Sequence, residues 1–191
     1  MNAMFKKLNN KLFQKRAQKY LCTSEREHRF VSYDKAKTVL LLFESDYSEK
    51  NPVVRKIIYN LQQDGKKVVA WGFVNKKEVM SSILLDFRII NLKQIDFFQK
   101  PITSFVNELK NMEFDLLIDL SLKPLLPIEY LAVYTNASCK TGLRKNELPV
   151  YDFMLDLENI QASEDPAENP IDEMYLFNQI IFYLKNIQTN D

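Results

Sequence analysis

A group of polar residues closes one of the most apolar stretches of the sequence. The run 114–120 carries Asp119 near its end, and Ser121 and Lys123 follow before a proline stops the run. A carboxylate accepts hydrogen bonds, a hydroxyl both donates and accepts them, and an ammonium group can hold an anion. The three residues are therefore candidates for binding a polar ligand.

A second polar group, Ser45 and Asp46, follows another apolar run at 38–44. Two carboxylates from separate strands can hold Mg²⁺ together or divide the roles of acid and base. Asp46 and Asp119 are the pair that this chemistry would use, if the fold brings them together.

The elements that must position these residues alternate along the chain. From Thr38 onward, short apolar or β-branched runs alternate with segments of helical periodicity, and the first run is apolar on consecutive positions, as in strands buried on both faces. Strand–helix–strand repeats imply right-handed crossovers and a parallel sheet. We therefore predict a Rossmann-like three-layer α/β/α sandwich. The expected strands are 38–45, 66–74, 87–92, 114–121, 139–144 and 151–157, and the expected helices are 52–64, 75–85, 101–112, 128–137 and 170–187.

The order of the strands decides where a ligand would bind. In doubly wound sheets ligands sit at the carboxyl ends of the strands, where the strand order reverses. An order of 3-2-1-4-5 along the sheet makes the first and fourth strands neighbours, so segment 44–51 should lie beside segment 119–124. This crevice would hold the candidate ligand-binding residues Ser45, Asp46, Asp119, Ser121 and Lys123.

A structural interpretation of the same residues stays open. Asp119 then only accepts backbone N–H groups of the adjoining loop, and Ser121 and Lys123 are solvated residues at the end of a strand. Local signals also frame the helix after the first strand: Asn51 is a candidate N-cap, Pro52 suits the first helical position, and Gly65 can end the helix.

Several site classes are excluded by composition. The three glycines are Gly65, Gly72 and Gly142, so neither G-x-G-x-x-G nor a Walker A loop is present. Cys22 and Cys139 are far apart and the one histidine, His28, lies in a polar segment, which argues against a zinc site and against Cys–His or Ser–His–Asp catalysis. We expect no cofactor, no metal, a free thiol at each cysteine, and a core position for Cys139.

The N-terminal region has its own character. Met4, Phe5, Leu8, Leu12, Phe13, Ala17, Tyr20 and Leu21 recur at helical spacing between lysines, which predicts a basic amphipathic helix over 4–21. Such a helix docks on its own domain, on a second copy, or weakly on an anionic membrane surface. We assign 1–37 to this helix and a polar connector, and 38–191 to one Rossmann-like domain.

Charge is segregated along the chain although the formal net charge is +1. Residues 1–37 hold ten Lys and Arg against three Asp and Glu, whereas residues 146–191 hold one Lys against ten acids, so we expect the two ends to attract each other. No apolar run reaches the roughly 20 residues that span a bilayer and no secretory signal is evident, which favours a cytoplasmic protein. The aromatic residues lie in apolar contexts, so a nucleic-acid partner is not expected.

The segments "FDLLIDLS", "LAVYTNASCKTGLR", "YDFMLDL" and "NQIIFYLKNI" together resemble a small bacterial family of unknown function. The middle of the chain also resembles the N-terminal, acceptor-side half of GT-B glycosyltransferases of the heptosyltransferase type, through "NPVVRKIIYNL", "FDLLIDLS" and "CKTGLR". This second resemblance implies a Rossmann-like half-fold and a sugar or nucleotide-like substrate. Of the Gly-Asp pair in that family's first loop only Asp46 is present, and the donor-binding half is absent.

Two functions follow as hypotheses. The first is a non-catalytic α/β module that binds a protein partner or a small polar ligand at the carboxyl edge of its sheet, with the N-terminal helix available for assembly into a homo-oligomer. The second is a sugar- or nucleotide-handling enzyme, or a fragment of one, that uses Asp46 and Asp119.

Overall fold

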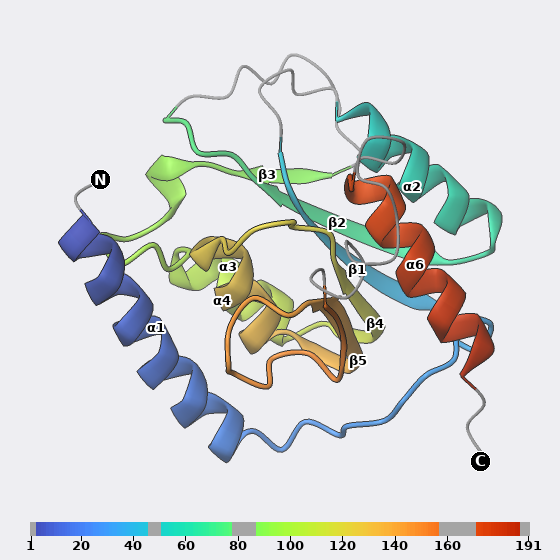
Figure 1. Cartoon of the computed structure of the whole chain (residues 1–191), viewed down its shortest axis with the longest axis horizontal. Helices are drawn as coiled ribbons and strands as arrows, with labels where there is room; N and C mark the ends of the chain where they lie inside the picture. Colours follow the sequence, from blue (N-terminus) through green and yellow to red (C-terminus); the bar gives the residue numbers. More distant parts are fainter. Residues whose placement is uncertain (1–2, 46–50, 78–86, 157–170, 188–191) are drawn as a thin grey trace.

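A computed structural model describes residues 3–45, 51–77, 87–156 and 171–187 of the chain (Figure 1). Six strands form one sheet in which every neighbouring pair is parallel. In chain order they are β1 (Thr38–Glu44), β2 (Lys67–Phe73), β3 (Arg88–Ile90), β4 (Glu113–Asp119), β5 (Asn136–Leu143) and β6 (Phe153–Leu155). The order across the sheet is β3-β2-β1-β4-β5-β6, which confirms the predicted reversal between the first and fourth strands.

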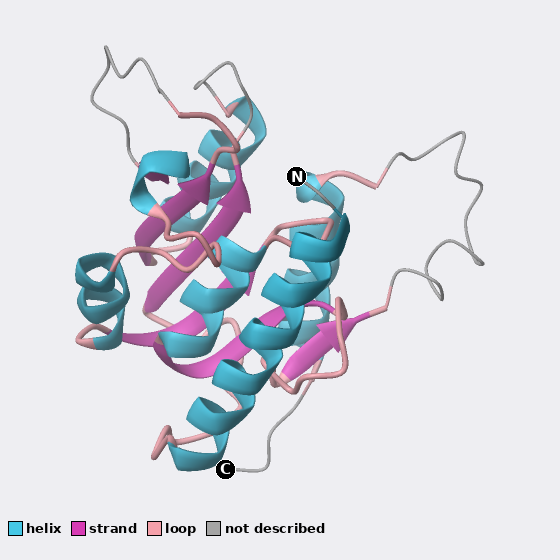
Figure 2. Cartoon of the chain, turned by 90° about the vertical axis from the view of Figure 1, so that its left-hand side faces the viewer, coloured by secondary structure: helices cyan, strands magenta, loops and turns pink. Residues whose placement is uncertain are grey.

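Helices cover both faces of the sheet (Figure 2). The helices are α1 (Ala3–Thr23), α2 (Pro52–Gln63), α3 (Thr103–Lys110), α4 (Leu126–Tyr134) and α6 (Glu173–Asn186), with a 3-10 turn η1 (Leu92–Gln94). One core joins the sheet to α2 and α6, and the other joins it to α1, α3 and α4. The Rossmann-like three-layer α/β/α architecture predicted from the sequence is therefore confirmed.

β1 shows why the sheet forms where it does. Leu41 and Phe43 point into the core with α2 and α6, while Leu40 and Leu42 point into the core with α1, α3 and α4. All four side chains are fully buried. A strand that is apolar at consecutive positions must be covered on both faces, and two helical layers provide that cover.

Several boundaries and local signals differ from the prediction. The predicted helix 128–137 ends at Tyr134, because Asn136 and Ala137 already pair with β4 as the start of β5. Asn51 is not a side-chain cap of α2: its backbone is left-handed, with φ 38°, and its amide donates to Ser45 Oγ at 3.1 Å. Gly65 ends the α2 region with φ 75°, as expected. The predicted helix 75–85 and the acidic segment 158–170 lie largely outside the described residues.

α1 packs on α4 with a face that differs from the predicted stripe. Asn9, Phe13 and Ala17 are buried, and the Phe13 ring meets the Tyr130 ring edge-on at 4.8 Å. Met4, Phe5 and Leu8, which belong to the predicted apolar stripe, are exposed, so only part of that stripe docks on the domain. The polar Asn9 lies one turn before Phe13 and takes the place of an apolar contact.

The connector after α1 packs against the sheet layer. Val31, Tyr33 and Ala36 are buried in the core with α2 and α6. Lys66 Nζ donates to the backbone carbonyls of Tyr33 and Ala36, each at 2.7 Å. The connector therefore adds both apolar contacts and hydrogen bonds to the sheet layer.

Candidate functional site

The carboxyl ends of β1 and β4 lie side by side, as their pairing requires. Lys123 Nζ, after β4, forms an ion pair with Glu44 Oε1, at the end of β1, over 3.0 Å. This contact confirms that the end of β1 and the segment after β4 share one edge of the sheet.

Asp119 is the centre of a buried polar cluster at this edge. Its side chain is 0% exposed. Oδ1 accepts the Ser121 N–H at 2.8 Å and the Ser121 hydroxyl, while Oδ2 accepts the Lys145 ammonium at 2.6 Å and the Tyr151 hydroxyl. The buried charge has a buried counter-charge and three further donors, which is the arrangement that a desolvated carboxylate requires.

Gly142 on β5 makes room for this cluster. A Cβ atom there would lie 3.2 Å from the Tyr151 ring and 3.3 Å from Asp119 Cβ. Without a side chain at this position the ring of Tyr151 lies against β5 and its hydroxyl reaches Asp119. Burial, followed by the charge of Asp119, raises the pKa of Tyr151 well above its ordinary value, so the hydroxyl stays protonated and donates.

Glu129 on α4 borders the same cluster but is less well satisfied. It is 2% exposed, and Oε2 accepts the Asn146 amide at 3.2 Å. Oε1 has no partner among the described residues. Burial raises the pKa of Glu129 to about 7, with Lys145 opposing the shift and Asp119 adding to it.

A cavity of about 970 Å³ opens in front of Glu129, between α1 and the carboxyl edge of the sheet. Its wall includes Asn9 of α1, which is 1% exposed and whose Oδ1 also has no partner among the described residues. Buried acceptors without a donor are costly, by about 1–3 kcal/mol each. Two residues of one cavity wall therefore carry acceptors that a hydrogen-bond donor would stabilise.

Of the five residues that the sequence singled out, the structure describes four: Ser45, Asp119, Ser121 and Lys123. Lys123 lines the cavity and is largely exposed. Asp119 and Ser121 bind each other behind the wall, and Ser45 accepts from the Asn51 amide. Asp46 lies outside the described residues, so its predicted convergence with Asp119 stays a prediction.

The sequence did not single out Asn9, Glu129, Lys145 or Tyr151. A signal existed for Glu129, because it is the one acid within the apolar α4 sequence "LPIEYLAVY". Asn9 had a weaker signal, as a polar residue at helical spacing from Phe13. Nothing local indicates that Lys145 and Tyr151 converge on Asp119, since this depends on the fold of the segment between β5 and β6.

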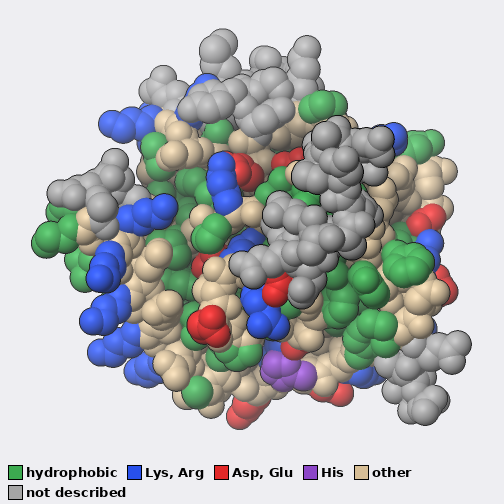
Figure 3. All heavy atoms as spheres, viewed as in Figure 1, with side chains coloured by type: hydrophobic (Ala, Val, Ile, Leu, Met, Phe, Trp, Pro, Cys, Tyr) green, Lys and Arg blue, Asp and Glu red, His purple; other side chains and the backbone are tan. Residues whose placement is uncertain are grey.

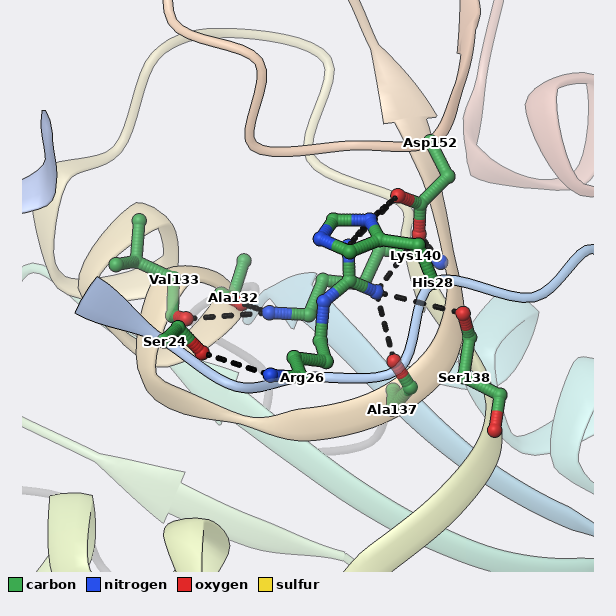
Figure 4. A network of polar contacts seen from close by, with 9 residues as sticks. All are labelled: Ser24, Arg26, His28, Ala132, Val133, Ala137, Ser138, Lys140 and Asp152. Atoms are coloured by element: carbon green, nitrogen blue, oxygen red, sulfur yellow. Dashed lines mark hydrogen bonds and ion pairs between the residues drawn. The ribbon is translucent and has the colours of Figure 1, made fainter. Parts of the chain in front are cut away.

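A second polar network fastens the connector to β5 and β6 (Figure 4). The Arg26 guanidinium holds Asp152 through both carboxylate oxygens, at 2.6 and 2.8 Å, and donates to the Ala137 carbonyl at 2.7 Å. His28 Nδ1 lies 2.8 Å from Asp152 Oδ1. This network joins the basic N-terminal region to an acid of the C-terminal region, as the charge distribution predicted for the two ends.

Lys140 extends this network toward α4. Its backbone N–H donates to Asp152 Oδ2 at 2.8 Å, and its Nζ donates to the carbonyls of Ala132 and Val133 at 2.7 and 3.1 Å, in the last turn of α4 (Figure 4). Burial, together with Arg26, lowers the pKa of Lys140 to about 7, and Asp152 opposes the shift. The side chain thus serves as a C-terminal cap for α4.

Both cysteines are free thiols, as predicted. Cys139 is fully buried, and this burial raises its pKa to about 11, while Cys22 is exposed. Within the described ranges, no group of three or more His, Cys, Asp or Glu side chains is arranged to hold a metal ion. No helix in the part of the chain that the structure describes is long and apolar enough to cross a membrane.

The fold and the site together define an α/β protein with a parallel Rossmann-like sheet and a polar cavity at the carboxyl edge of that sheet. The model of a family of unknown function (DUF6913) matches residues 6–187, and the chain belongs to this family. Neither the curated proteins nor the solved structures include a significant match to the chain.

Proposed function

We propose that the protein binds a small, uncharged, hydroxyl-rich ligand, of the sugar class, in the cavity between α1 and the carboxyl edge of the sheet. The observation that carries the proposal is that Asn9 and Glu129 both line this cavity and that each has a buried acceptor, Oδ1 and Oε1, without a donor among the described residues. Hydroxyl groups of a ligand would supply the missing donors.

The charges on the cavity wall favour an uncharged ligand. Three acids, Glu44, Asp96 and Glu129, and three lysines, Lys6, Lys123 and Lys145, line the cavity. Two of the lysines already bind carboxylates, Lys123 at Glu44 and Lys145 at Asp119. A phosphate would therefore meet acids as well as cations and would lack the glycine-rich backbone cradle of phosphate sites.

Apolar side chains complete the wall and suit the non-polar face of a sugar ring. Phe13, Phe73 and Phe97 line the cavity with Leu92 and Ile95. A wall that combines apolar side chains with placed polar groups is typical of small-molecule sites. The position of the cavity, at the carboxyl edge where the strand order reverses, supports the same function.

A sugar-handling enzyme is the second candidate. The resemblance to the acceptor half of GT-B glycosyltransferases and the position of the cavity at the reversal of the strand order favour it. In this case Glu129, whose pKa of about 7 suits a general acid or base, would take the role expected of Asp119. The donor substrate would have to bind outside this domain.

The test is a ligand screen on the purified chain, using neutral sugars, nucleosides, nucleotide sugars and sugar phosphates. A ligand at about a hundred times its dissociation constant adds about 2.7 kcal/mol to the free energy of unfolding, which a thermal-shift assay detects. We expect neutral sugars or their glycosides to stabilise the protein more than sugar phosphates.

Variants then locate the site. Asn9→Leu and Glu129→Gln should each weaken binding of the hit in calorimetry by about ten-fold or more, because each removes or alters one acceptor. Asn178→Leu, at an exposed position on α6, is the matched control and should leave the affinity unchanged. Unchanged affinity in both cavity variants would refute the proposal. A screen without any hit would shift the assignment to a protein partner at this edge.

A further inference from the structure

We infer that the protein associates with membrane surfaces that contain anionic lipid, through exposed side chains of α1 and the neighbouring Phe97. We name this surface the α1–Phe97 patch. It comprises the exposed side chains Met4, Phe5, Leu8 and Phe97 and the exposed lysines Lys7, Lys11, Lys15 and Lys19.

The apolar part of the patch is unusual for a surface helix. Phe97 is 69% exposed, Leu8 49% and Phe5 41%, although each is a large hydrophobic side chain. The Phe5 and Phe97 rings meet edge-on at 5.7 Å, so the helix and the turn after η1 form one continuous apolar surface. Contiguous exposed apolar side chains of this kind mark interaction sites more often than single exposed residues do.

Phe97 is held in place by its neighbours. Its ring meets the Phe98 ring edge-on at 5.4 Å, and the Arg16 guanidinium lies over the Phe98 ring at 5.5 Å. The adjacent carboxylate of Asp96 accepts the backbone N–H groups of Phe98 and Lys100, each at 2.8 Å. The aromatic side chain is thus presented to solvent from an ordered turn.

The basic part of the patch carries charge of a single sign. α1 contains six Lys and Arg residues and no Asp or Glu. In Figure 3 the blue side chains gather along the edge where α1 lies, and hydrophobic side chains lie beside the upper end of this strip. Leu8, Lys11 and Lys15 follow one another at spacings of three and four residues, so they share one face of the helix.

The docking face of α1 stays buried while the patch is exposed. Asn9, Phe13 and Ala17 pack toward α4, and the patch lysines lie on the other side of the helix. Phe5 lies one turn before Asn9, where its exposed ring contacts Phe97. The helix therefore does not have to leave the domain to bind a surface. An in-plane helix with lysines and large apolar side chains lies at the lipid headgroup boundary, with its apolar side chains inserted by about 5–10 Å.

The charge of the patch favours an anionic membrane over a second copy of the chain as its binding partner. A two-fold interface brings the same patch of both subunits together, which would place the lysines of one α1 against the lysines of the other. An anionic bilayer offers negative headgroups and an apolar interior at the same place, which matches both parts of the patch.

Co-sedimentation with vesicles tests the inference. We expect the protein to sediment with vesicles of equal parts phosphatidylcholine and phosphatidylglycerol. With vesicles of phosphatidylcholine alone it should stay in the supernatant, and binding to the anionic vesicles should weaken as salt is raised. Lys7→Gln/Lys11→Gln/Lys15→Gln should reduce binding by about a hundred-fold, since each lysine near an anionic surface contributes roughly five-fold. Phe5→Ser/Leu8→Ser/Phe97→Ser should reduce it by about ten-fold or more.

Matched controls remove the same groups elsewhere. Lys37→Gln/Lys56→Gln/Lys67→Gln lowers the charge equally, and Tyr59→Ser/Phe182→Ser removes exposed aromatic side chains from α2 and α6, on the other face of the sheet. Both controls should bind as the unaltered chain does, and circular dichroism should show that every variant is folded. Equal binding to neutral vesicles, no binding to anionic ones, or equal losses in the patch and control variants would overturn the inference.

Discussion

Two polar clusters lie along β5, one at Ala137 and Lys140 and one at Gly142, and they differ in how completely their groups are paired. In the Arg26–Asp152–Lys140 network each buried polar side chain has a partner, and the partners are backbone carbonyls and side chains of the fold itself (Figure 4). At the carboxyl edge Asp119 is equally well paired, but Glu129 and Asn9, which line the cavity, each keep a buried acceptor without a donor among the described residues. The first cluster is fully satisfied by the fold, whereas the cavity wall is not.

Asp119 and Glu129 occupy different positions within the carboxyl-edge cluster. Asp119 lies behind the cavity wall and orders the segment that carries Lys145 and Tyr151. Glu129 lies in the wall, and its Oε1 has no partner among the described residues. Substitution at Asp119 should therefore affect stability, and substitution at Glu129 should affect binding and pH dependence.

The largest effect is expected at Asp119. Asp119→Asn removes the counter-charge of Lys145, whose side chain is buried, and should lower the free energy of unfolding by about 3–5 kcal/mol in denaturant titrations. Adding Lys145→Met should recover part of the loss, because the isolated ammonium group is then gone. Asp152→Asn is the matched comparison and should cost half as much or less, since Asp152 is partly exposed. Equal losses at the two aspartates would contradict this view of the clusters.

Glu129 should give the next largest effect, and it depends on pH. Its pKa rises from 4.5 to about 7 on folding, which corresponds to about 3 kcal/mol at about 1.36 kcal/mol per unit. The folded state keeps a proton that the unfolded chain releases, so this contribution to stability is complete below about pH 4.5 and is lost as the pH rises to about 7. Glu129→Gln cannot lose that proton and should exceed the unaltered protein in stability by a margin that grows over this range.

Thermal unfolding at intervals from pH 4 to pH 8 measures this margin. A constant difference between the two proteins would show that Glu129 does not titrate in this range. A saturating ligand that donates to Glu129 should reduce the margin above pH 7, because it satisfies the ionised carboxylate.

Gly142→Ala should have a moderate effect that is confined to the carboxyl-edge cluster. The added methyl group would press on the Tyr151 ring at 3.2 Å and on Asp119, so we expect a loss of about 1–2 kcal/mol in the free energy of unfolding. Combining it with Tyr151→Phe should give less than the sum of the two losses, because both act on one contact. Additive losses would show that the methyl group is accommodated elsewhere.

The smallest effect is expected at His28, in the other cluster. Its ring is largely exposed where it contacts Asp152 and the Arg26 guanidinium, so His28→Gln should change the free energy of unfolding by less than about 1 kcal/mol. Arg26→Gln should cost clearly more, since the buried guanidinium also holds the carbonyl of Ala137. Equal stability losses in the two variants would contradict the expectation that the more buried partner of Asp152 contributes more to stability.

The fold class could be predicted from the sequence because it depends on short, repeated patterns. The consecutive apolar residues of β1 and the Pro52 and Gly65 signals around α2 each depend only on near neighbours. Boundaries were less accurate where two preferences compete: Asn136 and Ala137 continue the helical pattern of α4, but pairing with β4 draws them into β5.

The cavity lies at the edge of the sheet that the strand order indicates, but among the predicted site residues only Lys123 lines it within the described part of the chain. Strand order alone places the end of β1 beside the end of β4, and the Glu44–Lys123 ion pair reflects this. The cavity wall, however, is completed by Asn9, more than a hundred residues from Glu129 in the sequence. Its role depends on how α1 docks on α4, and a basic helix with apolar residues on several sides does not specify that rotation.

The docking of α1 has a consequence for how the chain is made. Arg26 and Asp152 are 126 positions apart, and α4, the surface that covers Phe13, also follows α1 by about a hundred residues. At a synthesis rate of about 5–20 residues per second, roughly 6–25 seconds pass between the emergence of Arg26 and of Asp152 from the ribosome. During that interval the buried face of α1 has no surface to cover it, so the nascent chain presents Phe13 and Ala17 to chaperones before it presents them to its own core.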